Sequence, residues 1–264
     1  MTETLLVHRD GPVVELCLNR PERLNGFDVP SFQRFRAALE TVALDPSVRA
    51  VVVTGTGRAF SAGGDVAAME GARTSGTLPT FFHDLTGEQE RSVRAIVGMA
   101  KPVVAALPGV AAGGGLSLAL AADWRIAAES ALLVPAFPAL GAVPDGGLTY
   151  FLPHFLGLGL AQEFLFTNAR IPAERARELG LLHEVVPAER LAERARERAR
   201  ELADGPTFAY GWMKRLLHSA FTEPLEGQLA RERQGAVEAA RRTELPEGIQ
   251  AFHAKRPAKF PPPG

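Results

Sequence analysis

The fold is decided by the segment KPVVAALPGVAAGGGLSLALAAD, residues 101–123, in which a buried strand pattern changes to a glycine-rich turn and then to an apolar helix pattern. From Pro102 to Ala122 the chain carries no charge over 21 residues, which is long enough to span a bilayer. Pro108, Gly109 and the glycines at 113–115 interrupt this run. We therefore predict a strand, a turn and a helix inside a protein core, and no membrane span.

A second glycine-rich turn follows another buried strand earlier in the chain. The strand pattern AVVVTG, residues 50–55, leads to FSAGGD, residues 60–65, just as PVVAALPG, residues 102–109, leads to VAAGGGLSLA, residues 110–119. Small residues let backbone N–H groups approach a ligand closely, and a helix that starts at the second turn points its positive end the same way. We expect the two turns together to bind one oxygen atom.

Hydrophobic patterning predicts an α/β body followed by a helical tail. Residues 4–19 read as a β-hairpin, a helix is expected from Ser31 to Asp45, and residues 123–129 read as a further strand. From Pro172 onward all patterns are helical. We place the boundary near residues 204–206, so that residues 1–204 form the body and residues 205–264 form a helical region.

The helical pattern at residues 189–201 is rich in arginine. Its apolar positions are expected to form one face, and its charges are expected to pair as Glu193 with Arg196 and Glu197 with Arg200. The expected apolar face consists of Leu191, Ala195, Ala199 and Leu202. With 29 Lys and Arg against 30 Asp and Glu in 264 residues, the chain has no basic excess, so we predict a solvated helix face and no nucleic-acid partner.

Composition indicates a soluble globular protein of a reducing compartment. Of the 264 residues, 46% are hydrophobic, and the single Cys17 cannot form an intrachain disulfide. The first residues lack the basic start and long apolar run of a secretory signal, so we expect a cytoplasmic location. The histidines and acids show no metal-ligand spacing, and no metal is predicted.

The string GLSLA around Ser117 resembles a nucleophile elbow, with Ala119 in place of the second glycine. A hydrolase triad would need Asp145 and either His154 or His183 as partners. Because buried serines in helices commonly bond back to a carbonyl oxygen, a packing role for Ser117 is the stronger interpretation.

Four motifs in order resemble those of the enoyl-CoA hydratase/isomerase, or crotonase, superfamily. They are NRPERLNGF at 19–27, AFSAGGDV at 59–66, the segment at 101–123 and GAVPDGGLTYFLPHFLG at 141–157. The resemblance extends over essentially the whole chain. It implies a spiral of β-β-α units with a helical C-terminal region, an acyl-CoA thioester substrate, no cofactor other than the coenzyme A of that substrate, and assembly into a homotrimer or hexamer.

The resemblance also implies roles for individual residues. The amides of Gly64 and Gly114 would hold the thioester oxygen, where negative charge develops when a neighbouring proton is removed. The residues expected to contact coenzyme A or the acyl group are Arg23, Leu24, Ala62, Asp65, Val66, Ser117, Phe137, Lys259 and Phe260. Lys259 and Phe260 would reach the adenine bound to a neighbouring subunit. Asp65 is equally suited to an N-cap role.

Departures from the family pattern bear on the reaction. Hydratases of the family use two glutamates, and this chain has Ser117 at the first place and Ala136 or Phe137 at the second. An acid does occur at Asp145, where isomerases of the family resemble this sequence. One carboxylate can move a proton from the α carbon to the γ carbon of a β,γ-unsaturated acyl-CoA. We therefore predict an acyl-CoA isomerase with Asp145 as its base.

Alternatives to this prediction remain open at this point. Asp145 could merely cap a helix beginning near Gly147. The chain could be a hydratase or dehydratase whose missing acids are replaced, or a protein that binds acyl-CoA without turnover. A family variant that attacks aryl-CoA halides would use the acid as a nucleophile, and His83, near an expected lid at residues 67–80, could then take part.

Overall fold

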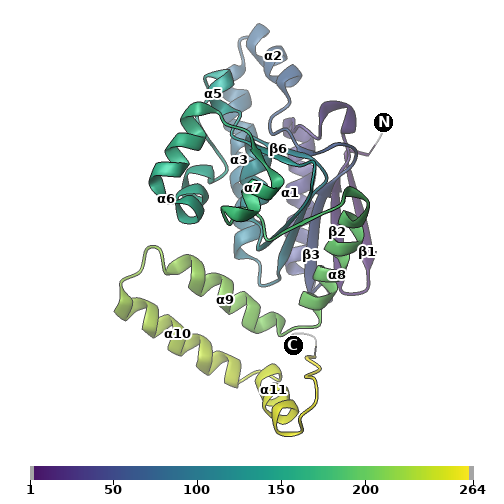
Figure 1. Ribbon diagram of the computed structural model, residues 1–264, viewed down its shortest axis with the longest axis vertical. Coiled ribbons are helices and arrows are strands. Elements are labelled where there is room, and N and C mark those ends of the chain that lie inside the picture. The colour runs from purple at the N-terminus through teal and green to yellow at the C-terminus, as the bar shows by residue number, and fades with distance from the viewer. Residues whose placement is uncertain (1–2, 262–264) are drawn as a thin grey trace.

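The structure is a computed structural model that describes residues 3–261 (Figure 1). Its strands are β1 (Leu5–Asp10), β2 (Val13–Leu18), β3 (Ala50–Gly55), β4 (Ala59–Ser61), β5 (Val103–Leu107), β6 (Val110–Ala112), β7 (Trp124–Ala128), β8 (Leu132–Val134), β9 (Ile171–Pro172) and β10 (Glu184–Val186). Its α-helices are α1 (Val29–Leu44), α2 (Val66–Thr74), α3 (Leu78–Gly98), α4 (Gly114–Ala121), α5 (Phe137–Leu140), α6 (Leu148–Thr167), α7 (Ala173–Glu178), α8 (Leu191–Ala203), α9 (Thr207–Ser219), α10 (Leu225–Ala240) and α11 (Glu244–His253).

The strands form two sheets. The larger sheet has the order β1-β2-β3-β5-β7-β10 and is parallel except for the hairpin of β1 and β2. The smaller sheet has the order β4-β6-β8-β9 and is parallel except between β8 and β9. Each of β3, β5 and β7 continues into a short strand of the smaller sheet, and a helix follows. This repetition is a spiral of β-β-α units, so the predicted fold is confirmed.

The uncharged segment at residues 102–122 folds as predicted. It supplies β5, a turn, β6 and the helix α4, of which every residue is buried. Among residues 3–261, no helix is both long enough and apolar enough to cross a membrane.

The start of α1 differs from the prediction. The N-cap is Asp28, whose side chain accepts a hydrogen bond from the Ser31 amide at 2.9 Å, while the Ser31 hydroxyl accepts one from the Asp28 amide at 3.0 Å. The expected start at Ser31 is therefore wrong by one turn. Ser31 is the N3 residue of a capping box with Asp28, and the two side chains satisfy two backbone N–H donors.

Helix α8 covers one face of the larger sheet through its apolar side, while α1, α3 and α4 contribute to the main core. The buried side chains of α8 are Leu191, Ala195, Ala199 and Ala203. Leu202, expected among them, is half-buried against the same cluster. The prediction of one apolar face is thus confirmed with a shift of one residue at its end.

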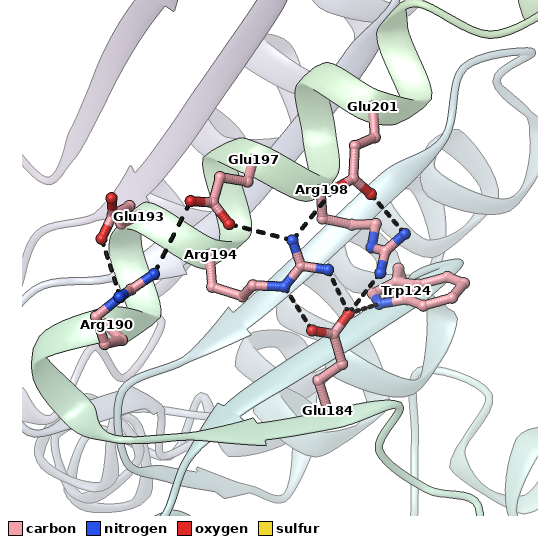
Figure 2. Close-up of polar contacts among 8 residues, drawn as sticks. All are labelled: Trp124, Glu184, Arg190, Glu193, Arg194, Glu197, Arg198 and Glu201. Carbon is pink, nitrogen blue, oxygen red and sulfur yellow. Dashed lines mark hydrogen bonds and ion pairs between the residues drawn. The ribbon is translucent and has the colours of Figure 1, made fainter.

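The charges of α8 pair differently from the prediction, because acids from other strands reach them. Arg196 binds Glu15 of β2 at 3.0 Å, and Arg200 binds Asp10 of β1. Figure 2 shows Glu184 of β10 bound to Arg194 at 2.6 Å and to Arg198 at 2.9 Å. The arginine-rich face is therefore largely neutralised by carboxylates of the same chain.

Helices α9, α10 and α11 project away from the sheets as a separate layer (Figure 1). Two buried cations join this layer to the body. Lys214 of α9 donates to the carbonyl oxygen of Ile96 at 2.9 Å and binds Asp123 at 2.7 Å. Arg49, just before β3, donates to the Gly205 oxygen at 2.7 Å and to the Thr207 hydroxyl at 3.1 Å. The boundary predicted near residues 204–206 thus lies directly on a contact between the two regions.

Candidate active site

Three neighbouring strands of the smaller sheet end at the same edge and bring three loops together. The strands β4, β6 and β8 are parallel, and they lead directly into residues 62–64, 113–114 and 135–137. Because parallel strands point their carboxyl ends the same way, these three turns meet although they are separated by tens of residues in sequence. The convergence forms one wall of a cavity of about 270 Å³.

The cavity is mostly apolar, and α2, α3, α5 and the loop before α6 complete its wall. Its aromatic lining consists of Phe27, Phe32, Phe82 and Phe137. Among the described residues that line it, Gln89 and Asp145 alone have polar side chains. Ligand sites of this kind combine an apolar wall with a few polar groups that fix orientation.

The two glycine-rich turns touch at the floor of this cavity. Gly63 has a φ of +87°, and a Cβ atom there would lie 2.9 Å from both the Ala112 oxygen and the Gly114 nitrogen. Gly64 and Gly114 both line the cavity, and within residues 3–261 neither amide donates a hydrogen bond to a protein acceptor. Since buried backbone N–H groups are nearly always paired, two free amides side by side point to a ligand oxygen.

Asp145, in the loop between α5 and α6, lines the same cavity as these amides. Its main-chain oxygen is held by the Ser117 hydroxyl at 2.8 Å and by the Leu148 amide at 3.1 Å. Its Oδ1 atom is buried and has no hydrogen-bond partner within the described chain. The N-cap of α6 is Gly147, and no side chain caps that helix. The alternative in which Asp145 merely caps a helix is therefore wrong.

Burial raises the pKa of Asp145 to about 6, and hydrogen bonding from the Gln89 side chain opposes the rise. A carboxyl group with this pKa is still mostly ionised at neutral pH, and it binds a proton more strongly than an ordinary aspartate. These are the properties of a general base, and perturbed carboxyl groups of this kind concentrate at functional sites.

The raised pKa predicts that Asp145→Asn stabilises the fold at neutral pH. Because the pKa is 3.8 in a free aspartate and about 6 here, the ionised carboxyl group costs the folded state about 2 to 3 kcal/mol. The gain in the free energy of unfolding should be complete above pH 6 and vanish below pH 3.8. Urea unfolding at several pH values measures it, with the exposed Asp84→Asn as control. An equal gain at every pH would contradict the assignment.

The residues predicted to contact the substrate divide into three groups. Ala62, Val66 and Phe137 line the cavity. Arg23 is exposed in the turn beside it, and the Leu24 oxygen in the same turn accepts a hydrogen bond from the Ala62 amide at 2.9 Å. Lys259 and Phe260 lie against residues 247–248 of α11. Figure 1 shows α11 at the end of the molecule opposite α2 and α5.

Asp65 is fully engaged within the protein. Its side chain caps α2 by accepting a hydrogen bond from the Ala67 amide at 2.9 Å, and it binds Arg20 at 2.8 Å. Its exposed fraction is 7%. The N-cap interpretation of Asp65 is confirmed, and this residue fixes the start of the helix that follows Gly64.

Ser117 lies behind the cavity wall. It is fully buried, and its hydroxyl is within hydrogen-bond distance of the Asp145 oxygen and of the Gly113 oxygen, at 2.8 and 3.3 Å. Neither expected triad histidine is its partner, because His183 Nδ1 accepts from the Arg125 amide and His154 Nδ1 contacts the Tyr150 oxygen. The hydrolase alternative is therefore wrong, and Ser117 holds the loop that carries the base.

Two further positions bear on the alternative reactions. His83 is exposed on α3 and is not part of the cavity lining, so it is not placed to assist a nucleophile there. Ala136 and Phe137 line the cavity at the second place where hydratases of the family have a glutamate. Among the described lining residues, Asp145 is thus the single titratable group.

Gln89 is a site residue that the sequence analysis missed. It lies on the buried side of α3 with an exposed fraction of 2%, between Leu85 and Ile96. The available signal was a glutamine at a position where helical spacing from Leu85 requires an apolar residue. Such a buried amide must be hydrogen-bonded, which is a reason to suspect a functional role.

The fold and this cavity together define a crotonase-type enzyme. Residues 8–262 match the family described as enoyl-CoA hydratase/isomerase. The chain is 39% identical over 260 residues to the 1,2-epoxyphenylacetyl-CoA isomerase of Escherichia coli K12, covering 98% of this chain and 99% of that one. It is 34% identical to the carnitinyl-CoA dehydratase of Salmonella typhi, covering 97% of each.

Solved structures agree with this assignment. A crystal structure of an enoyl-CoA hydratase from Polaromonas sp. JS666 superposes with a TM-score of 0.92 at 32% identity, covering 97% of this chain and 99% of that one. The chain belongs to the enoyl-CoA hydratase/isomerase family and is an enzyme of it. Its relatives include isomerases, hydratases and dehydratases.

Proposed function

We propose that this enzyme is an acyl-CoA isomerase that moves a double bond from the β,γ to the α,β position of an acyl-CoA thioester. The observation that carries the proposal is Asp145, the single carboxyl group among the described residues that line the cavity, which also contains the free amides of Gly64 and Gly114. Moving one proton between two carbons needs one base. Adding water across a double bond requires a water to be held and its protons to be moved, for which the family uses two acids.

In the proposed reaction, the Asp145 carboxylate takes a proton from the α carbon of the bound thioester. The electron pair of that C–H bond enters a dienolate, whose negative charge rests largely on the thioester oxygen. The Gly64 and Gly114 amides donate hydrogen bonds to this oxygen, and one such donor contributes roughly 2.7 to 4 kcal/mol. Asp145 then returns the proton to the γ carbon, which gives the conjugated thioester and restores the carboxylate.

The shape and lining of the cavity support a short or ring-bearing acyl group. Its volume is about 270 Å³, and the aromatic side chains of Phe27, Phe32, Phe82 and Phe137 face it. Rings pack well against such walls in offset or edge-to-face geometry. The relative from Escherichia coli is named for 1,2-epoxyphenylacetyl-CoA, a thioester whose acyl group contains a ring. A ring-epoxide isomerisation through the same base and oxyanion site is therefore included in the proposal.

Assembly into a trimer or hexamer is part of the proposal. The helical region exposes large apolar side chains on α9 to α11 and between α9 and α10. They include Phe221, Leu225, Ile249 and Phe252, which are 51% to 82% exposed. Because Lys259 and Phe260 lie far from the cavity of their own subunit, contact with coenzyme A would be made across a subunit interface.

The experiment that tests the reaction offers β,γ- and α,β-unsaturated acyl-CoA separately in heavy water, with a straight-chain and a ring-bearing acyl group. We expect the β,γ substrate to become conjugated, which ultraviolet absorbance follows, and the α,β substrate to remain unhydrated. Mass spectrometry records deuterium uptake. Hydration of the α,β substrate would favour the hydratase alternative instead, and tight binding with neither conjugation nor exchange would refute catalysis of this kind.

A further inference from the structure

The carboxamide of Gln89 lies between the base and the oxyanion turn. Its Nε2 atom donates to the Gly114 oxygen at 3.3 Å, and Gln89 and Asp145 line the same cavity. Gly114 thus accepts this hydrogen bond through its oxygen, and the same residue lines the cavity with its amide. One side chain of α3 therefore contacts the residue that carries an oxyanion donor, close to the residue that carries the base.

Both neighbouring turns leave room for this carboxamide. A Cβ atom at Gly114 would lie 2.9 Å from Gln89 Oε1, and a Cβ atom at Gly146 would lie only 1.9 Å from Gln89 Nε2. Gly146 directly follows Asp145 and has a φ of +57°, a conformation that favours glycine. The backbone on each side of Gln89 is thus shaped around the amide, and a larger residue at either position would displace it.

We propose that Gln89 is a positioning residue that ties the Asp145 carboxyl group to the turn that carries the Gly114 amide. A primary amide has two N–H donors. One is used by the Gly114 oxygen, and the second is available to Asp145, whose Oδ1 atom remains free for the substrate proton. The proposal deepens the proposed function, because it takes Asp145 as the base, but its main test does not depend on turnover.

The electrostatic consequence has a definite sign. Hydrogen bonding from Gln89 favours the ionised carboxyl group and lowers its pKa, against the larger effect of burial. Among described residues, the cavity lining contains no other charged group. The adjacent Glu88 of α3 is bound to Arg36 and Arg91, each at 2.6 Å. Loss of the Gln89 donors should therefore raise the pKa of Asp145.

The test is a titration of Asp145 in Gln89→Met and Gln89→Glu. Carbon-13 NMR of aspartate carboxyl groups reports the pKa directly in the free enzyme, and the resonance that disappears in Asp145→Asn identifies the residue. Met keeps the size of the side chain and removes both donors, so we expect the pKa to rise by about 1. Glu adds a second carboxyl group beside Asp145. The two coupled groups should then titrate in two steps, and the higher of the two apparent pKa values should exceed the pKa in Gln89→Met. The exposed Gln33→Met serves as the matched control and should change nothing.

A pKa that is the same in wild type and in both variants would overturn the proposal, and so would a lower pKa. If Gln89→Met fails to fold, the titration of Gln89→Glu alone tests the proposal, because the glutamate side chain has nearly the same shape as glutamine. In the pH profile of α-proton exchange, the acid limb should move up with the measured pKa, whereas a merely structural role would lower the rate at all pH values. Absence of any exchange in wild type would refute the proposed reaction and leave the NMR result intact.

Discussion

Asp145→Asn is expected to lower kcat for double-bond isomerisation by about a thousandfold, within the range of roughly 10² to 10⁴ that a positioned base contributes. Asparagine has nearly the size of aspartate but cannot accept the α proton. The effect should fall on kcat and not on substrate affinity, because the apolar cavity and the amides of Gly64 and Gly114 remain. Steady-state kinetics with a β,γ-unsaturated acyl-CoA, together with a binding titration of a saturated analogue, separates the two quantities.

Two controls accompany this experiment. Asp84→Asn removes an exposed carboxylate outside the cavity lining and should leave kcat unchanged. The acid limb of kcat/KM in wild type should lie near pH 6, the pKa of Asp145, with activity rising as pH increases because the ionised form is the base. An Asp145→Asn enzyme with turnover close to that of wild type would remove this residue from the mechanism.

Gly114→Pro is expected to lower kcat/KM by roughly 10² to 10³ relative to Gly114→Ala, because proline has no N–H to donate to the thioester oxygen. Gly114 is the first residue of α4, a position that proline tolerates well in helices. Both substitutions add a Cβ atom 2.9 Å from Gln89 Oε1, so both disturb that side chain to a similar degree. The ratio of the two variants therefore reports the replacement of the Gly114 N–H by a ring carbon at the oxyanion position.

The measurement is kcat/KM for both variants with the same substrate, supported by thermal unfolding to show that each is folded. Gly114→Ala alone should reduce activity moderately through the displacement of Gln89. Equal rates for the proline and alanine variants would mean that the Gly114 amide does not contact the developing negative charge.

Local signals in the sequence were sufficient to predict the α/β body and the two glycine turns, whereas the spiral of β-β-α units was predicted from the family resemblance. The buried strand β5 is a continuous apolar run, β3 is apolar as far as Thr54, and β7 is apolar except for Arg125. Each is bounded by glycine, proline or charged residues. The three-residue strands of the smaller sheet were not predicted separately, because their pairing joins segments far apart in sequence. The register of these strands brings Gly64 beside Gly114. The geometry of the oxyanion site therefore could not be predicted from the sequence.

Errors arose at the start of one helix and where the partner of a residue came from another element. The helix pattern around Ser31 was correct, but the cap at Asp28 sets where it begins. Arg196 and Arg200 were expected to pair within their helix, but they bind acids of β1 and β2 across the sheet. Gln89 was missed because its hydrogen-bond partner Gly114 is 25 residues away in sequence and no motif marks it.

Arg49 has a consequence for how the molecule holds together. Its guanidinium group is buried and donates to the main-chain oxygens of Gly205 and Phe260 and to the hydroxyl of Thr207. All three belong to the C-terminal region. A chain cut after Asp204 would remove all three of these acceptors from Arg49, and loss of the partners of a buried charge typically costs several kcal/mol. The body and the C-terminal helices are therefore expected to unfold in one cooperative transition, so that the tail is no dispensable appendage of the catalytic part.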